Sequence, residues 1–356
     1  MPGLEPIVTN VRPPIDPSVF GPLDHNLDAT MPVPLPFLGG FLYRQLLITP
    51  PKPSTRFDGK TIIVTGSNVG LGLEAARHFG RLGAGRVILA VRDLEKGEVA
   101  KKSIDRTLRR SPSPVSVWKL DLSSYDSVQE FAARACNELD RVDVVCENAG
   151  IATGTFRLTE RDESSITTNV VSTFLLAFLL LPKMKETAQR FNTVPTISVT
   201  SSEVHMFSSF PELNEPDIFG TLSDKSKANM LNRYAVSKLL QIFAVREMAS
   251  RTDSPYPVTI NCLNPGFCHS ELAREAGWYL YIMGILLARS TEVGSRTILA
   301  AAEAGPETHG KYMSESVVIE PSEWVRSQEG ERVQKRVWDE LMTKLETIVP
   351  GVTANL

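Results

Sequence analysis

The feature that most constrains the fold is a repeated alternation of short apolar runs with longer amphipathic stretches. Six runs are rich in Val, Ile and Leu and are too short for helices: 61–65, 86–91, 115–120, 142–148, 195–202 and 258–264. Helical patterns follow them, over 70–83, 94–110, about 124–139, about 160–189 and a stretch around Tyr234. Runs that are apolar along their whole length are typical of strands buried on both faces. The sequence therefore predicts an α/β fold with helices on both faces of a mainly parallel sheet.

This alternation predicts a single doubly wound, Rossmann-type domain over residues 57–350, with a sheet of about seven strands. The seventh strand is expected at 316–321, "SVVIEP". A chain of 356 residues with 42% hydrophobic residues has enough apolar material for one large core. In such sheets, ligands bind outside the carboxyl ends of the strands.

Two segments precede the predicted domain. Residues 1–34 are interpreted as a proline-rich arm, because the first 53 residues hold 12 of the 24 prolines and proline excludes regular helix and central strands. Residues 35–56 form an apolar lead-in that includes "LPFLGGFLYRQLLI" (35–48). This stretch is too short to span a bilayer, which leaves packing on the body, weak contact with a membrane surface, or disorder. No secretory signal is evident, so we expect a cytoplasmic protein, either free or membrane-associated.

Charge and cysteine spacing exclude two classes of partner. The net charge is −3, the pI is about 6.0 and no long basic run occurs, so nucleic acid is not an expected partner. The four cysteines form no CxxC pair and no histidine cluster lies near them, so we expect no metal site and four reduced thiols.

A glycine-rich stretch, "TGSNVGLG" (65–72), follows the first predicted strand and opens a helix. Gly66 permits a tight turn, and Gly70 lets the backbone approach a pyrophosphate at the helix N-terminus, where free N–H groups favour anions. Gly72 lets the helix pack close to the sheet. The spacing differs from the GxGxxG of long-chain dehydrogenases, but the strand–loop–helix context predicts dinucleotide binding.

Two charged residues, Arg92 and Asp93, end the second predicted strand in "AVRD" (90–93). A dehydrogenase that selects NAD usually has an acid at this point to bond the ribose hydroxyls. The planar guanidinium of Arg92 instead matches the 2′-phosphate of NADP, so we expect NADP(H) as the cofactor. Asp93 follows directly, so an acid is also present near this point, and its alternative role is a cap of the next helix.

A tyrosine and a lysine stand four residues apart in "RYAVSK" (233–238). One helical turn separates them, so Tyr234 and Lys238 share a helix face. An ammonium near a phenol favours the phenolate, so we expect a lowered tyrosine pKa and a usable proton donor or acceptor. The pair alone is also compatible with an ordinary exposed helix.

Taken in order, these motifs resemble the short-chain dehydrogenase/reductase superfamily, and more closely its retinol-dehydrogenase-like branch. "TGSNVGLG" and "AVRDLEKGE" are similar to that branch's first two strand–helix turns. "DLSS" (121–124), "ENAG" (147–150) and "NPG" (264–266) are similar to its later motifs. The resemblance covers about residues 37–347, and Glu147 departs from it by replacing an asparagine. A carboxylate there is expected to be solvated or paired.

The resemblance implies a role for each matching residue. Tyr234 is expected to be the catalytic acid/base, Lys238 its electrostatic partner, Ser202 (rather than Ser201) the catalytic serine, and Asn169 the holder of a proton-relay water. His205 is either a pocket or supporting residue or a surface residue with no role. The implied cofactor-binding residues are Gly66, Asn68, Gly70, Leu71, Gly72, Arg92, Asp121, Leu122, Asn148, Ala149, Gly150, Tyr234, Lys238, Pro265, Gly266 and Ser270.

These expectations define an NADP(H)-dependent oxidoreductase that reduces a carbonyl, or oxidises the corresponding alcohol, of a hydrophobic small molecule. Residues 203–233 are expected to line the pocket, together with the apolar 276–288, which is otherwise a core or dimer-contact helix. The family implies a homodimer through the Tyr–Lys helix. Alternatives are a non-redox step such as epimerisation or cyclisation, and a cofactor-sensing regulator without turnover.

Overall fold

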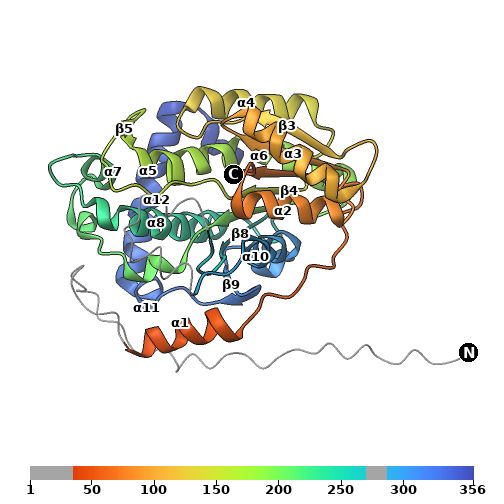
Figure 1. Ribbon diagram of the computed structural model, residues 1–356. Coiled ribbons are helices and arrows are strands. Elements are labelled where there is room, and N and C mark those ends of the chain that lie inside the picture. Colours follow the sequence, from red (N-terminus) through yellow and green to blue (C-terminus); the bar gives the residue numbers. More distant parts are fainter. Residues whose placement is uncertain (1–34, 270–286) are drawn as a thin grey trace, which may run out of the picture.

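The computed structural model describes residues 35–269 and 287–356, and these build a three-layer α/β arrangement (Figure 1). Within the described residues the central sheet has eight strands in the order β10-β9-β8-β7-β4-β1-β2-β3. All neighbours from β3 to β9 are parallel, and β10 alone is antiparallel. The predicted fold class is therefore confirmed. The strands are β1 (Thr61–Thr65), β2 (Arg86–Val91), β3 (Val115–Lys119), β4 (Val144–Glu147), β7 (Thr196–Thr200), β8 (Thr259–Asn264), β9 (Tyr312–Ser314) and β10 (Val317–Ile319).

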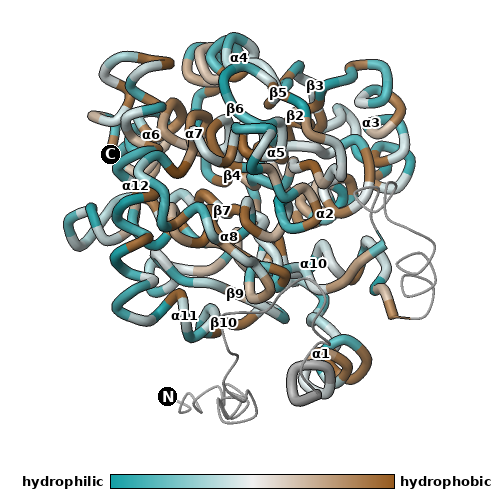
Figure 2. Tube along the Cα trace, turned by 90° about the vertical axis from the view of Figure 1, so that its left-hand side faces the viewer, coloured by the Kyte–Doolittle hydropathy of each residue, from teal (hydrophilic) through white to brown (hydrophobic). Residues whose placement is uncertain are grey.

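Helices cover both faces of this sheet and enclose two apolar cores (Figures 1 and 2). One core lies under α2, α3 and α10, and the larger one under α4, α6 and α8, with α12 packed outside α8. The long helices are α1 (Leu35–Leu47), α2 (Gly70–Arg81), α3 (Leu94–Leu108), α4 (Tyr125–Glu138), α6 (Ser172–Phe191), α8 (Met230–Ser250), α10 (Thr291–Glu303) and α12 (Gln328–Ile348). Shorter elements are α5 (Ser164–Ile166), α7 (Ile218–Leu222) and α11 (Glu323–Arg326), the 3-10 turns Glu203–Phe207, Pro211–Asn214, Pro306–Thr308 and Val352–Asn355, and the hairpin β5 (Leu158–Thr159) with β6 (Asp162–Glu163).

Local sequence explains where the central elements begin and end. Every residue of β1, "TIIVT", is buried, as expected for a strand with helices on both faces. Asp93 accepts a hydrogen bond from the Lys96 N–H, which confirms its interpretation as the N-cap of α3. Ser124 caps α4 in the same way through the Ser127 N–H. The first six predicted strands all form within two residues of their expected bounds.

The helix predicted from about residue 160 begins later, and its first turns are irregular. Residues 158–163 form the β5–β6 hairpin instead, with Glu160 at φ 56°. The carboxylate of Glu163 then caps α5 through the Ser165 N–H. A π-helical turn over Thr167–Val171 joins α5 to α6. Apolar periodicity does not reveal a two-residue hairpin or a widened turn, which is why the predicted boundary is wrong.

The strand predicted at 316–321 forms as β10, but a further short strand before it was missed, so the sheet has eight strands rather than about seven. The structure places a parallel strand earlier, at β9, and residues 317–319 return antiparallel to it as β10. Glu315 and Ser316 both have positive φ, 49° and 68°, which is the geometry of a tight two-residue hairpin turn. The turn has no glycine or asparagine, so it could not be predicted from the usual turn residues.

The longest apolar helical stretch, 164–191, belongs to the core. It is long and apolar enough to cross a membrane, but 94% of its most apolar window is buried inside the protein.

Helix α12 packs on α8, and the 3-10 turn Val352–Asn355 packs on α6. The ring of Trp338 on α12 lies 6.1 Å from that of Phe178 on α6. The predicted homodimer through α8 is untested, and α12 covers part of that helix. The cytoplasmic location also stays a prediction.

Helix α1 is packed on the body, which is one of the three alternatives considered for residues 35–48. Arg44 and Gln45, the polar residues that interrupt its apolar sequence, are both 7% exposed. The Gln45 amide nitrogen donates to the carbonyls of Phe267 (2.6 Å) and Leu287 (2.7 Å). Tyr43, Leu46 and Leu47 stay exposed on the outer side of the helix. The arm 1–34 lies outside the described residues.

Candidate functional site

The predicted motifs meet at one edge of the sheet because they follow parallel neighbouring strands. The glycine loop follows β1, Arg92 follows β2, "ENAG" spans the end of β4, Ser202 follows β7 and Pro265 follows β8. This edge is the carboxyl end of the sheet, where α/β folds bind their ligands.

The glycine loop leaves an open approach to the N-terminus of α2. Gly70 has φ +64°, and a Cβ added there would meet nothing within 4 Å. The N-cap residue Val69 has no side-chain hydrogen bond, so no side chain caps the first N–H groups of α2. Gly66, at φ +63°, lies against Ala149, whose Cα would be 2.9 Å from an added Cβ. These features suit a bound pyrophosphate.

Other predicted cofactor residues surround this loop. Asn68 is half-buried within it, and Leu71 packs against the core under α2 and α10. Gly72 has no room for a side chain, because a Cβ would lie 2.6 Å from the Asn148 amide nitrogen. That amide also donates to the Thr65 carbonyl at 2.9 Å.

Thr65 ties the two cofactor loops together, a role that sequence reasoning missed. Its hydroxyl oxygen accepts from the N–H groups of Asn148 (3.0 Å) and Ala149 (2.9 Å). Gly150 follows, and a Cβ there would lie 3.1 Å from the Asn169 amide oxygen. The threonine that begins "TGSNVGLG" could have indicated this role, since a hydroxyl at a strand end can hydrogen-bond the backbone of a neighbouring loop.

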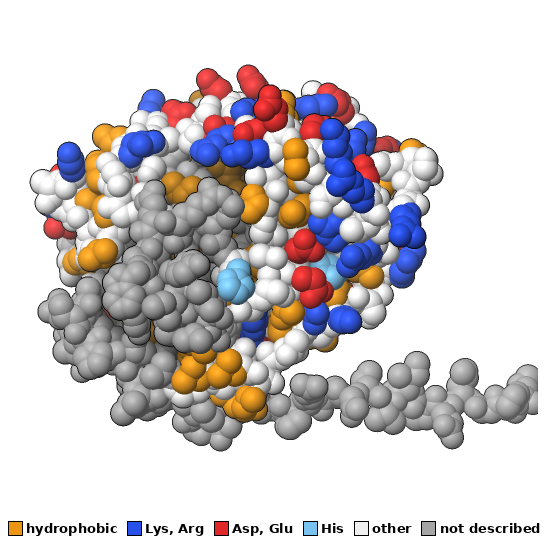
Figure 3. Space-filling view, in the orientation of Figure 1, with side chains coloured by type: hydrophobic (Ala, Val, Ile, Leu, Met, Phe, Trp, Pro, Cys, Tyr) orange, Lys and Arg blue, Asp and Glu red, His pale blue; other side chains and the backbone are white. Residues whose placement is uncertain are grey.

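Arg92 is exposed at the end of β2, at the start of the surface formed by α2 and α3. Figure 3 shows lysine and arginine side chains gathered on that side of the molecule. Among the described residues, no acidic side chain forms an ion pair with its guanidinium. Asp121 holds its own turn by accepting from the Ser123 N–H (3.0 Å), and Leu122 is buried beside it.

Glu147 is neither solvated nor paired, which corrects the expectation for a carboxylate at this strand end. It is 1% exposed, and no cation in the described part of the chain forms an ion pair with it. Burial raises its pKa to about 8, and neither of its carboxyl oxygens has a hydrogen-bond partner among the described residues. The protein thus accommodates the carboxyl group mainly in its protonated form at neutral pH.

The predicted catalytic residues come together above β7. Tyr234 and Lys238 share one face of α8, with the lysine Nζ 5.4 Å from the tyrosine ring centre. The Ser202 side chain hydrogen-bonds to the Tyr234 side chain. Ser201 points elsewhere, because it is 2% exposed and its hydroxyl donates to the Lys238 carbonyl at 3.0 Å. The geometry therefore agrees with the choice of Ser202 over Ser201.

The pKa values of this pair differ from the expectation. Burial raises the pKa of Tyr234 to about 12, and the hydrogen bond with Ser202 only partly opposes this rise. Burial also lowers the pKa of Lys238 to about 7. The predicted lowering of the tyrosine pKa by the ammonium is therefore wrong, because burial has the largest effect on both pKa values, although Tyr234 is only half-buried.

Asn169 lies in the π-helical turn and is fully buried. Its side chain bonds both backbone groups of Ile151, accepting from the N–H (2.8 Å) and donating to the carbonyl (2.9 Å). The side chain also donates to the Ser237 hydroxyl at 3.0 Å. Asn169 thus holds the loop after "ENAG" against α8, and the relay water remains a prediction.

His205 is buried and supports Ser202, which settles the two alternatives left by the sequence. Its Nδ1 lies 2.8 Å from the Ser202 carbonyl, and its Nε2 accepts from the Ser322 N–H at 3.3 Å. These partners fix the proton on Nδ1. Burial lowers the pKa of His205 to about 4, so the ring is neutral at physiological pH.

The turn after β8 is hydrogen-bonded to Glu203, the residue after Ser202, and to Gln45 of α1. The Asn264 side-chain oxygen accepts from the N–H groups of Glu203 (3.2 Å) and Gly266 (3.1 Å). Gly266 has φ +79°, and Pro265 before it is buried. Asn264 and Gln45 were not predicted as site residues, although Asn264 begins the "NPG" motif. Ser270 and nearly all of 276–288 lie outside the described residues.

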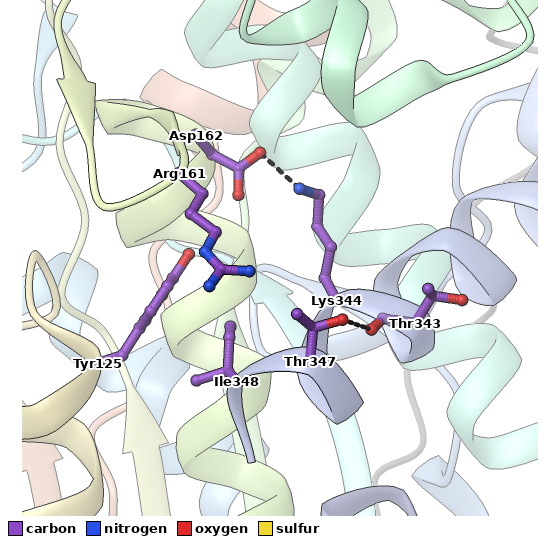
Figure 4. A pocket seen from close by; sticks show the side chains of 7 residues that line it. All are labelled: Tyr125, Arg161, Asp162, Thr343, Lys344, Thr347 and Ile348. Atoms are coloured by element: carbon purple, nitrogen blue, oxygen red, sulfur yellow. Dashed lines mark hydrogen bonds and ion pairs between the residues drawn. The ribbon is translucent and has the colours of Figure 1, made fainter. Parts of the chain in front are cut away.

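Two cavities lie away from this edge, and no predicted site residue lines either. One, of about 140 Å³, is lined by residues that include Tyr125, Arg161 and Ile348, and Figure 4 shows the Lys344 ammonium directed at the Asp162 carboxylate, 2.8 Å away. The other, of about 420 Å³, lies between the ends of α8 and α12. No group of three metal-ligating side chains occurs in the described ranges 35–269 and 287–356.

The fold and the site define a class of protein, namely dinucleotide-binding enzymes with a tyrosine–lysine pair. A family model for short chain dehydrogenases matches residues 60–210. The short chain dehydrogenase/reductase dmxR8 of Cryptosporiopsis sp. (strain 8999) is 52% identical over 89% of this chain and 99% of its own length. The short-chain dehydrogenase anuD of Penicillium roqueforti (strain FM164) is 42% identical over 88% of this chain and 84% of its own. The chain belongs to the short-chain dehydrogenase/reductase family, whose members use nicotinamide cofactors.

Solved structures agree with this assignment. An uncharacterized protein from Mycobacterium Paratuberculosis has a TM-score of 0.61 at 25% identity, covering 82% of this chain and 96% of its own. A short chain dehydrogenase from Escherichia coli CFT073, solved with NADPH, has a TM-score of 0.55 at 23% identity, covering 74% and 99%. The likeness to the second shows the fold alone. The names of these proteins do not distinguish the retinol-dehydrogenase-like branch, so that finer assignment stays a prediction.

Proposed function

We propose that this oxidoreductase uses NADP(H) to reduce a carbonyl group of a hydrophobic small molecule, or to oxidise the corresponding alcohol. The observation that carries the proposal is the meeting of Ser202, Tyr234 and Lys238 at the sheet edge that also holds the open N-terminus of α2. All the groups needed for proton transfer are retained, which favours a redox enzyme over a non-redox enzyme or a cofactor sensor.

The residues at this edge suit a dinucleotide in three places. The open N-terminus of α2 would take the pyrophosphate, with Gly70 leaving room for it. Arg92, exposed and free of an acidic partner in the described part of the chain, would take the 2′-phosphate that distinguishes NADP from NAD. Asn148, Ala149 and Gly150 would hold the nicotinamide half. The bound cofactor supplies the hydride that reaches the carbonyl carbon.

The side chains supply the proton and the electrostatics. The pKa of Tyr234, about 12, keeps the phenol protonated at neutral pH, so it is ready to donate a proton to the carbonyl oxygen. The Ser202 hydroxyl donates a hydrogen bond to the same oxygen and stabilises the charge that develops there. Lys238, when protonated, stabilises the tyrosinate that forms once Tyr234 has donated its proton. In the alcohol oxidation the same groups act in reverse.

The test is NADPH oxidation, followed at 340 nm, against a panel of hydrophobic ketones. We expect turnover with at least one ketone, and the Tyr234→Phe variant should bind NADPH but turn over roughly 10²–10⁴-fold more slowly. Cofactor fluorescence confirms binding by both proteins. Near-normal turnover by the phenylalanine variant would remove Tyr234 from the mechanism. Failure with every ketone and alcohol, despite tight NADPH binding, would favour the non-redox or sensor alternatives.

A further inference from the structure

A glutamine on α8, Gln241, connects the lysine of the site to the π-helical turn. It lies three residues after Lys238 and is 1% exposed. Its amide oxygen lies 3.1 Å from the Lys238 Nζ. Its amide nitrogen donates to the main-chain carbonyl of Asn169 at 2.7 Å. One buried side chain therefore links two of the four predicted catalytic residues.

The Asn169 carbonyl lies in an irregular turn. The turn Thr167–Val171 is π-helical, and the Ser172 N–H that follows it bonds back to the Thr167 carbonyl, five residues earlier. A carbonyl oxygen has two lone pairs, so it can accept from a donor outside its own helix. The Gln241 amide is such a donor, from a different helix.

The orientation of this amide follows from its two neighbours. The Asn169 carbonyl can only accept, and the Lys238 ammonium can only donate. Rotating the amide by half a turn would place its nitrogen against the ammonium and its oxygen against the carbonyl. Both contacts would then be repulsive. The turn therefore fixes the amide with its oxygen directed at the lysine.

We propose that Gln241 is a positioning residue, whose amide oxygen holds the Lys238 side chain and favours its ammonium form. This positioning role rests on the proposed function in one respect, namely that Lys238 takes part in catalysis. The other acceptor of the lysine is the Thr200 carbonyl on β7, at 2.8 Å. These two oxygens direct the ammonium between β7 and the π-helical turn.

The surroundings of Lys238 make Gln241 the side chain that most affects its charge. The groups facing it are the Tyr234 ring on its own helix, the Thr200 carbonyl on β7, Asn169 in the π-helical turn and the backbone of Gly150, where an added Cβ would lie 3.7 Å from the Nζ. In the described part of the chain, no carboxylate forms an ion pair with this ammonium. Burial alone accounts for its lowered pKa. The side chain that stabilises the Lys238 ammonium is thus a neutral hydrogen-bond acceptor, the Gln241 amide oxygen.

The experiment measures the charge of Lys238 directly, without turnover. Protein labelled with ¹³Cε-lysine is titrated by NMR, and the Lys238→Arg variant identifies the resonance. Gln241→Met, which keeps the length but removes the acceptor, should lower the Lys238 pKa by roughly 1–2 units. Gln241→Glu should raise it by at least about one unit, because a carboxylate then faces the ammonium. An unchanged pKa in both variants would overturn the proposal.

Two further variants control for damage to the fold. Gln334→Met removes another buried glutamine, which donates to Glu247 at 2.7 Å on the far side of α8, and should leave the Lys238 pKa unchanged. Gln241→Asn keeps the amide but shortens the side chain, so it should also lower the Lys238 pKa. This variant provides the measurement if Gln241→Met does not fold. A Lys238 shift in Gln334→Met as large as in Gln241→Met would count against a specific contact.

The two proposals fail separately. If no ketone or alcohol reacts while the lysine resonance shifts as expected, the positioning role stands and the proposed reaction does not. If the wild-type protein reduces a ketone while the Gln241 variants leave the pKa and the pH profile unchanged, the reaction stands and the positioning role does not.

Discussion

The Nζ of Lys238 lies 5.4 Å from the ring centre of Tyr234, yet burial moves the two pKa values in opposite directions. The pKa of the tyrosine rises to about 12 and that of the lysine falls to about 7. Each shift favours the neutral form of its group, as the loss of hydration requires. At neutral pH the phenol keeps its proton, and the lysine is the member of the pair that titrates.

Carbonyl reduction should therefore fall as the pH rises through about 7, when Lys238 loses its charge. The tyrosine cannot cause this fall, because its pKa is near 12. The rate should drop by up to about tenfold per pH unit above the lysine pKa. The measurement is kcat/KM between pH 5.5 and 9, with Lys238→Arg as the comparison, since a guanidinium stays charged throughout. A flat wild-type profile up to pH 9 would contradict this assignment.

Arg92→Ala should weaken NADPH binding by about 10- to 150-fold, which corresponds to one charge-assisted contact of roughly 1.5–3 kcal/mol. NADH binding should change little, because NADH lacks the 2′-phosphate. Fluorescence titration with both cofactors provides the measurement. Arg106→Ala, an exposed arginine of α3 away from the strand end, is the matched control. An equal loss for both cofactors would show that Arg92 does not recognise the phosphate.

The adjacent serines should behave differently when each is replaced by alanine. Ser202→Ala removes the hydroxyl that bonds Tyr234 and should lower kcat by roughly 10²–10³-fold. Ser201→Ala removes a buried bond to the Lys238 carbonyl and should cost about 1 kcal/mol of stability, with a smaller effect on kcat. Steady-state kinetics and urea unfolding separate the two effects. A larger loss of kcat in the Ser201 variant would reverse the assignment.

Glu147→Gln should change how stability depends on pH. The folded protein holds the Glu147 proton with a pKa of about 8, whereas the ordinary value is 4.5. The folded state thus binds this proton more tightly, so the contribution to stability is full below pH 4.5 and is lost as the pH rises to about 8. The loss is on the order of 5 kcal/mol, and the glutamine variant should not show it. Urea midpoints at pH 6 and pH 9 test this, and parallel pH dependence in the two proteins would refute it.

Removing α1 should destabilise the protein more than removing the segment before it. A chain lacking residues 1–50 loses the buried side chains of Arg44 and Gln45, and Gln45 alone makes three hydrogen bonds to the turn after β8 and to Leu287. A chain lacking residues 1–34 keeps all of these contacts and is the control. We expect the Tm to fall by several degrees in the first chain only. Equal Tm values would show that α1 adds no stability.

The sequence predicts the centre of the fold well because the physical cause is local there. The first six strands are buried on both faces, and their apolar runs, such as "TIIVT", reveal both their place and their length. Strand β10 was predicted, but β9 was missed because it has only three residues and is joined to β10 by a turn at Glu315 and Ser316, which are not typical turn residues.

The site was predictable where a motif carries its own chemistry. The glycine loop, Arg92 and the Tyr234–Lys238 pair all lie where the strand–helix order places them. The pKa values were not predictable, because spacing shows that two groups are near each other and does not show how little water reaches them. Thr65, Gln241 and Gln45 act through long-range hydrogen bonds, which single-sequence patterns do not encode.

The contacts of α1 have a consequence for the order in which this protein can fold. Gln45 bonds residues 222 and 242 positions further along the chain. During synthesis α1 leaves the ribosome early, but its binding surface on the turn after β8 exists only after most of the chain has been made. The docking of α1 is therefore a late event in folding, because the sheet and the turn after β8 must form before Gln45 has its partners.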